Sequence, residues 1–139
     1  MQPDKISNLK SILMENEYRV TSPRLAVFRI LAKNGPLSIA EILRKSDGQL
    51  DRVGVYRNIE LFEKLGIVNR VNIGWKYKIE LSDKFVDHHH HLTCSGCGAT
   101  QEIHDEEHLD QFVQKIAKQK SFSNVSHIFE IQGLCADCS

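Results

Sequence analysis

The chain lacks the long apolar segments and targeting features that would assign it to a membrane or to export. No stretch approaches the roughly 20 apolar residues needed to cross a bilayer, and residues 1–8 do not lead from a basic region into an apolar run, as a secretory signal does. We therefore expect a cytoplasmic protein without a membrane partner. Its 139 residues, 41% of them hydrophobic, can bury one core or two small ones.

A net charge is also absent, because 18 basic residues balance 18 acidic ones. The two signs are unevenly distributed, however. Residues 1–80 contain 14 lysines and arginines against 9 aspartates and glutamates (net +5), whereas residues 81–139 contain 4 against 9 (net −5). A basic half can approach phosphates, and an acidic half is suited to cations. We expect the two halves to have different partners.

The first half has the pattern of several helices followed by a hairpin. Apolar residues recur at helical spacing. One helix is predicted to begin at Ser22 as its N-cap, another at Ser38, where Glu41 has the spacing of a capping box, and a third near Asp51. This last helix is expected to stop at Gly66. Two β-prone runs follow, Ile67–Val71 and Trp75–Leu81, separated by a turn at residues 72–74. The pattern predicts a winged helix-turn-helix.

The second half changes character after residue 87. A strand is expected over Ala99–Ile103, an amphipathic helix over Leu109–Ala117, and a strand over Val125–Ile131. The fold class is therefore α+β. We predict a winged-helix DNA-binding domain at residues 1–82, a hinge at 83–87 and a small α/β domain at 88–139.

Cysteine is scarce and paired. The four cysteines form two Cys-x-x-Cys motifs, Cys94–Cys97 and Cys135–Cys138, and each such turn can supply two ligands to a tetrahedral zinc ion. Buried free thiols or a redox pair are the alternatives, but neither needs two matched motifs. Because four thiolates leave no open coordination position, we predict a structural Zn²⁺.

Four consecutive histidines, His88–His91, precede the first cysteine pair. Alternate residues of a strand face opposite sides, so this run can serve two metal centres. Histidines with acidic partners nearby, among them Glu80, Glu102 and His104, indicate a regulatory site of mixed nitrogen and oxygen ligands. The alternative is a solvated loop with idle histidines.

Several motifs resemble the ferric uptake regulator family of bacterial metal-sensing repressors. They cover nearly the whole chain: residues 20–25 opening a helix, residues 55–59 (Val-Tyr-Arg-Asn-Ile) in the expected recognition helix, residues 65–68 closing it, residues 88–98, and His127 eight residues before Cys135.

The resemblance implies a homodimer that contacts double-stranded, inverted-repeat operator DNA and has no small-molecule substrate or enzymatic activity. It places Tyr56 and Arg57 at the major groove and Arg19 at the minor groove. Independently, an arginine such as Arg57 can contact guanine or phosphate, and Arg52 can contact phosphate. The alternative for Tyr56 is a partly buried core aromatic residue.

The resemblance also implies two further metal sites besides the zinc. A regulatory site would bind Fe²⁺, Zn²⁺ or Mn²⁺, and an accessory site would lie beside it. Iron homeostasis is the expected role, and a zinc, manganese or peroxide sensor of the same family is the alternative. The regulatory ligands are Glu80, His89, His91 and Glu102; the accessory ligands are His88, His90, Asp110 and His127.

This sequence departs from the family pattern at five places. The family's interdomain histidine falls at Pro36, which cannot ligate a metal, and Glu80 lies two residues further from the histidines. His90 stands where the family's accessory site has an aspartate. The carboxylate that a helix supplies to that site in the family aligns near Leu109, and Glu107, His108 or Asp110 could substitute for it. In the recognition helix Val53-Gly54 replaces Ala-Thr, and a glycine there costs roughly 1 kcal/mol relative to alanine.

Two rival classes remain. The first is a DNA-binding protein that has only the structural zinc and no metal switch, for which Pro36 is the best support. The second is a zinc hydrolase, which would need an open metal position and a general base.

Overall fold

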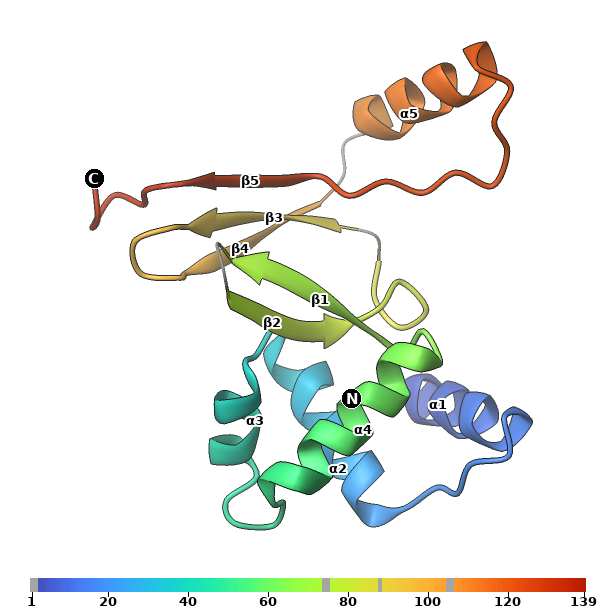
Figure 1. Cartoon of the computed structure of the whole chain (residues 1–139), viewed down its shortest axis with the longest axis vertical. Helices are drawn as coiled ribbons and strands as arrows, with labels where there is room; N and C mark the ends of the chain where they lie inside the picture. The colour runs from blue at the N-terminus through green and yellow to red at the C-terminus, as the bar shows by residue number, and fades with distance from the viewer. Residues whose placement is uncertain (1–2, 74–75, 88, 105–106) are drawn as a thin grey trace. The chain divides into compact units, whose positions relative to one another are not determined.

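The computed structural model describes residues 3–73, 76–87, 89–104 and 107–139. The chain divides into two compact units, Met1–Asp87 and His88–Ser139, and each is described by itself (Figure 1). Within the described ranges, no helix has both the length and the apolar character required to cross a membrane.

Four helices and a hairpin make up the first unit. The helices are α1 (Pro3–Glu15), α2 (Ser22–Asn34), α3 (Ile39–Lys45) and α4 (Arg52–Lys64). At α3 the predicted capping box is present: the Ser38 hydroxyl accepts from the Glu41 N–H at 3.1 Å, and the Glu41 carboxylate accepts from the Ser38 N–H at 3.0 Å. Helix α4 is followed by Gly66, whose φ of 71° suits glycine and ends the helix as predicted.

The N-cap of α2 is Thr21, so the prediction of Ser22 was wrong by one residue. Thr21 has extended backbone geometry, and its hydroxyl accepts from the Arg24 N–H at 3.4 Å. Its carbonyl accepts the first helical hydrogen bond, from Leu25 at 3.0 Å. Ser22 is therefore already helical, and Pro23 follows in the first turn, where its missing N–H costs no bond.

Strands β1 (Val68–Ile73) and β2 (Lys76–Leu81) form the antiparallel hairpin of the first unit. Ile73 pairs with Lys76, so residues 72 and 73 belong to β1 and not to the predicted turn. The last position of the predicted turn, Gly74, and the first of the second predicted strand, Trp75, lie outside the described residues. The backbone of Leu37, just before α3, adds two hydrogen bonds of 2.7 and 2.8 Å with Ile79 of β2.

The first unit has an extensive apolar core. Leu9, Leu13, Phe28 and Phe62 are completely buried, and Phe85 packs edge-on against Phe28 with ring centroids 4.9 Å apart. The segment predicted as a hinge thus contributes a side chain to this core. Burial of this kind stabilises the unit by about 1.5–3 kcal/mol per large side chain.

The second unit is a three-stranded sheet with one helix. Strand β3 (His89–Cys94) pairs antiparallel with β4 (Thr100–His104) and parallel with β5 (Glu130–Gly133), and α5 (Glu107–Gln119) lies between β4 and β5 in sequence. Figure 1 shows α5 beyond the end of the sheet, with the chain returning from it along an irregular segment to β5.

The predicted strand over residues 125–131 is wrong for most of its length, because β5 begins only at Glu130. His91 pairs with Glu130, and β3 begins at His89. In this register, residues before 128 extend past the first residue of β3. An extended segment needs a paired neighbour to be a strand, and periodicity alone does not reveal where that neighbour starts.

The second unit buries few apolar side chains of its own. Among its described residues the buried hydrophobic ones are Cys94 and Ala117. Large apolar side chains are instead exposed on α5, on the returning segment, on β5 and directly after β5: Phe112, Ile116, Phe122, Ile128, Ile131 and Leu134. A unit with so small a core needs a cross-link, a metal or a partner surface for stability.

Candidate metal centres and nucleic-acid interface

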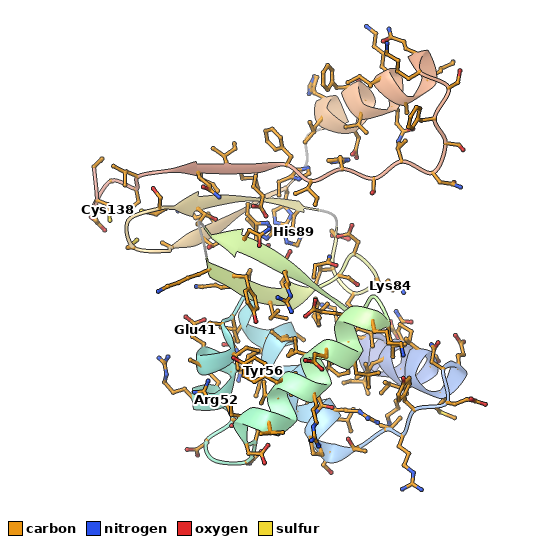
Figure 2. The ribbon with its side chains drawn as sticks, in the orientation of Figure 1. Glu41, Arg52, Tyr56, Lys84, His89 and Cys138 are labelled. Carbon is orange, nitrogen blue, oxygen red and sulfur yellow. The ribbon has the colours of Figure 1, made fainter. Side chains whose placement is uncertain are left out.

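The four cysteines meet at one end of the second unit. Their sulfurs all lie within 4.8 Å of one another, and Figure 2 shows Cys138 beside the turn that joins β3 to β4. The Cys97 and Cys135 sulfurs are 3.9 Å apart. A Cβ at Gly96 would lie 3.1 Å from Cys138 Sγ, so glycine permits the close approach of the two motifs.

The backbone around Cys94 favours its thiolate form. Its Sγ accepts from the N–H groups of Cys135 at 3.3 Å, Cys97 at 3.4 Å and Gly96 at 3.3 Å. These bonds, with that from Cys135 the most effective, lower the pKa of Cys94 from 9.0 to about 6. At Cys138 the opposite holds: its side-chain hydrogen bond with Cys135, followed by those with the other two thiols, raises the pKa to about 12.

This donor set fits a zinc ion. Four thiolates at about 2.3 Å from a tetrahedral Zn²⁺ stand about 3.8 Å apart, close to the distance between Cys97 and Cys135. Sulfurs this close resist simultaneous ionisation, as the raised pKa of Cys138 indicates. A divalent cation between them removes that repulsion, and the ion would join the chain's end to the β3–β4 turn.

Histidines occupy both faces of β3. On one face, His89 and His91 have ring centroids 4.8 Å apart. His91 pairs with Glu102 of β4 across the antiparallel register, and His89 Nε2 lies 4.0 Å from Glu102 Oε1. Both histidines are nearly enclosed by protein. This face therefore gathers three of the four residues predicted for the regulatory site.

The opposite face of β3 carries the predicted accessory residues. His90 is buried with its ring 5.2 Å from that of His127, and His127 Nε2 lies 3.9 Å from Asp110 Oδ1 of α5. His88 lies outside the described residues. The structure thus brings three of the four predicted accessory residues into one neighbourhood.

The fourth predicted regulatory residue, Glu80, belongs to the first unit. It lies on β2 opposite Asn69 of β1 and is 8% exposed. Pro36, also in the first unit, is half-buried next to Leu37 and offers no donor side chain.

Helix α4 presents a polar surface that is separate from the core. Val55, Ile59 and Phe62 of α4 are buried, whereas Tyr56 is 40% exposed and Arg57 is exposed. Arg52, in the first turn and labelled with Tyr56 in Figure 2, is exposed as well. Tyr56 is therefore not one of the buried core aromatic residues, and its ring is accessible from outside.

Arg19 lies in the loop before α2. Its side chain is exposed, and its carbonyl accepts a hydrogen bond from Arg24 Nη1 at 2.6 Å. This bond ties the loop to α2 while leaving the Arg19 guanidinium available. On the hairpin, Lys78 is already paired with Glu41 at 3.7 Å, so it is a poorer phosphate contact than its charge alone suggests.

Sequence reasoning left two residues without a defined role. His104, considered only as a possible partner of the histidine run, lies opposite His89 in the register of β3 and β4. Gly54 was interpreted only through its cost to a helix, but it donates its N–H to the Asp51 carboxylate at 2.6 Å. The preference of aspartate for N-cap positions is the signal that would have indicated the second of these contacts.

Comparison with known proteins agrees with this architecture. Residues 15–132 match the sequence model of the Ferric uptake regulator family. The "Ferric uptake regulation protein" of Neisseria gonorrhoeae is 29% identical over 97% of this chain and 95% of its own length. The protein of the same name from Legionella pneumophila is 33% identical, over 86% of this chain and 90% of its own.

Solved structures show the same fold. The Vibrio cholerae ferric uptake regulator matches with a TM-score of 0.75 and 27% identity, over 91% of this chain and 99% of that one. A zinc-bound manganese uptake regulator matches with a TM-score of 0.68 and 27% identity, over 92% and 98% of the two chains. A zinc uptake regulator complexed with zinc and DNA shares the fold with a TM-score of 0.61 and 23% identity, over 96% and 92%.

Proposed function

The chain belongs to the ferric uptake regulator family, whose members are transcriptional regulators of metal homeostasis and not enzymes, and we propose that it is a metal-responsive repressor. In this proposal it binds inverted-repeat operator DNA as a cytoplasmic homodimer. The cysteine cluster holds a structural Zn²⁺, and a second divalent metal at the histidine sites controls DNA binding.

One observation carries this proposal: the register of β3 and β4 gathers His89, His91 and Glu102 on one sheet face of a chain whose other unit exposes Tyr56 and Arg57 on α4. Imidazole and carboxylate together suit borderline divalent metals. An exposed tyrosine and arginine on a helix of a winged-helix unit suit the edges of bases and the DNA backbone. The proposed metal-sensing residues and the proposed DNA-binding residues thus lie in different units of one protein.

The homodimer is supported by the exposed apolar surface of the second unit. Phe112 and Ile116 on α5 are 60% and 44% exposed, and Ile131 lies on β5, one of the two edge strands of the sheet. A second copy packing on this surface would bury it and would position two α4 helices for two half-sites. Such half-sites are about one helical turn, or 34–36 Å, apart, or a multiple of that.

Metal would act by restricting the angle between the two units of each chain. Glu80, on the outgoing strand of the hairpin, supplies the ligand from the first unit, while His89, His91 and Glu102 supply those of the second. By linkage, a metal that strengthens DNA binding must itself bind more tightly when DNA is present.

We propose iron as the sensed metal, because the similar proteins are named for ferric uptake regulation. Zinc and manganese are the alternatives, since regulators of both share the fold. Ligand chemistry alone does not separate these ions, because their affinities follow the same order at any nitrogen and oxygen site.

The test is fluorescence anisotropy with the full-length protein. A duplex is first selected from a random-sequence pool with metal-loaded protein, and its affinity is then measured with Fe²⁺, Mn²⁺ or Zn²⁺ and after mild chelation that leaves the cysteine zinc in place. We expect at least one metal to strengthen binding by tenfold or more, on the order of the usual allosteric coupling. Equal affinity in all conditions would favour the alternative of a DNA-binding protein without a switch, for which the donor-free side chain of Pro36 is the supporting observation.

A further inference from the structure

His104 ends β4 on the same sheet face as the predicted regulatory residues. In the antiparallel register it stands directly opposite His89, and Glu102 stands opposite His91. Directly opposed residues in an antiparallel pair share a face, as do residues i and i+2 of one strand. All four side chains therefore project from one face, and all four belong to the second unit.

The Glu102 carboxylate lies between two imidazoles. Its Oε1 is 4.0 Å from His89 Nε2, and its Oε2 is 3.6 Å from His104 Nε2. The rings of His89 and His104 are 6.3 Å apart, and those of His89 and His91 are 4.8 Å apart. Nitrogen and oxygen ligands at about 2.1 Å from a metal stand roughly 3.0–3.4 Å from one another in octahedral or tetrahedral geometry. The His104–Glu102 contact therefore exceeds ligand spacing by about 0.2–0.6 Å, and the His89–Glu102 contact exceeds it by about 0.6–1.0 Å.

His104 can shorten its own contact to Glu102 without loss of packing. Its side chain is 71% exposed and that of Glu102 is 42% exposed, whereas that of His89 is 4% exposed. Rotation of the exposed imidazole and carboxylate about their side-chain torsions displaces no core residue, and the Glu102 rotation can also shorten the contact to His89. The enclosed His89 and the exposed His104 then flank the carboxylate.

We propose that His104 is a ligand of this metal site together with His89, His91 and Glu102. The inference rests on the proposed function, which places a regulatory metal on this face, and it adds a donor that makes the set complete within the second unit. Three imidazoles and one carboxylate form a four-coordinate set suited to Zn²⁺ and to Fe²⁺ or Co²⁺. The second unit then holds enough donors to bind metal by itself, and Glu80, the ligand from the first unit, transmits the bound state to that unit without determining the affinity.

An ordinary surface contact between His104 and Glu102 is the competing explanation. A surface ion pair contributes only about 0–1 kcal/mol, and it would need no second imidazole on the other carboxylate oxygen. The two explanations differ in what happens when metal is added. If His104 is a ligand, the NMR signal of its ring nitrogen shifts when metal is added. If His104 is only a surface partner of Glu102, that signal stays where it is.

The experiment uses the full chain with zinc retained at the cysteines and with ¹⁵N-labelled histidine. Zn²⁺, which is diamagnetic, is titrated while the ring nitrogens are followed by long-range ¹H–¹⁵N correlation, and the dissociation constant is measured in parallel by competition with a chelator. The variants are His104→Ala, the matched control Gln101→Ala on the opposite face of β4, and His91→Ala as the reference for loss of the site.

We expect a ring nitrogen of His104 to shift in step with those of His89 and His91. His104→Ala should weaken Zn²⁺ binding by at least about tenfold, since even the partners of metal ligands are worth about 10- to 100-fold, and Gln101→Ala should leave affinity unchanged. Zn²⁺ that shifts His89 and His91 but not His104, or a His104→Ala variant with unchanged affinity, would overturn the role of His104 and leave the proposed function standing. A His91→Ala variant that binds Zn²⁺ with unchanged affinity, together with no shift of any ring nitrogen on this face, would contradict the proposed regulatory site. It would therefore contradict the role of His104 as well.

Discussion

Cys97 Sγ lies 3.9 Å from Cys135 Sγ although 38 residues separate them in the chain. The contact joins the turn after β3 to the segment after β5, and it occurs in a unit that buries only Cys94 and Ala117 among its described hydrophobic residues. In the proposed function, a zinc ion held by the sulfurs and a second copy on the exposed apolar surface would supply much of the stability of this unit.

Replacement of Cys138 by serine is expected to release the zinc. The oxygen is a poorer zinc ligand than a thiolate, and the last residues of the chain lose their anchor. We expect retained zinc after mild chelation to fall from about one ion per chain to well below one, and amide exchange to increase in β3 and β5 while α2 and α4 stay protected, because the first unit has its own core.

The matched control for this prediction is Ser139→Ala. Ser139 is the exposed neighbour of Cys138, and its hydroxyl donates to the Ala136 carbonyl at 3.3 Å. Its zinc content should equal that of the wild type. Uniform loss of protection in both units of Cys138→Ser would mean that the two units do not fold independently.

Tyr56 and Arg57 are expected to determine DNA affinity without affecting stability. Both are exposed on α4, so alanine substitution removes little packing. Arg57→Ala should cost about 1–3 kcal/mol of binding free energy if it contacts a base in bidentate fashion, or should lower the salt dependence by about one phosphate contact if it binds the backbone. Anisotropy titrations at several salt concentrations distinguish these outcomes.

Lys118→Ala is the charge-matched control for Arg57→Ala. Lys118 is an exposed basic residue of α5, in the second unit. Its replacement should leave both the affinity for DNA and the melting temperature unchanged. A loss equal to that of Arg57→Ala would indicate a general effect of net charge and would count against α4 as the recognition helix.

Gly54 and Asp51 are expected to be energetically coupled. A Cβ at residue 54 would lie 2.7 Å from Asp51 Oδ1, the atom that caps α4. Gly54→Ala gains helix propensity of about 1 kcal/mol but disturbs a cap whose loss costs about 1 kcal/mol. We therefore expect Gly54→Ala to stabilise the protein clearly in the background Asp51→Ala and much less in the wild type, as measured by a double-mutant cycle of denaturant unfolding. Equal gains in both backgrounds would show that the cap adjusts freely.

Glu80→Gln is expected to separate metal binding from the switch. If the four donors of the second unit suffice to bind metal, the variant should bind the regulatory metal with an affinity within a few fold of the wild type. The strengthening of DNA binding by metal should nevertheless shrink, because the ligand from the first unit is gone. A loss of metal affinity as large as that caused by His91→Ala would instead make Glu80 an essential ligand.

The capping box and the end of α4 illustrate what could be predicted locally. Ser38 and Glu41 are three residues apart, and Gly66 follows an apolar helical pattern directly, so both features depend on neighbours in the chain. The N-cap of α2 was missed by one residue because Thr21 and Ser22 are both good caps, and only the extended backbone of Thr21 distinguishes them.

The strands of the second unit illustrate what could not be predicted from local sequence. The alternation of residues 125–131 is a real strand signal, but β5 forms only where β3 lies beside it. Likewise, the His91–Glu102 and His89–His104 pairs depend on the register of β3 and β4, and a shift of one residue would move one strand's side chains to the other face.

The sequence by itself determined the family, the α+β class, the donor types and the alternation of the histidine run between two strand faces. These follow from residue identity and short spacing, which act through local geometry. The tertiary structure decided which donors meet and which side chains of α4 are exposed. It brought the cysteine sulfurs within 4.8 Å of one another, left Tyr56 accessible on α4, and set His104 beside Glu102, because strand register, chain return and burial are long-range properties that depend on packing over the whole unit.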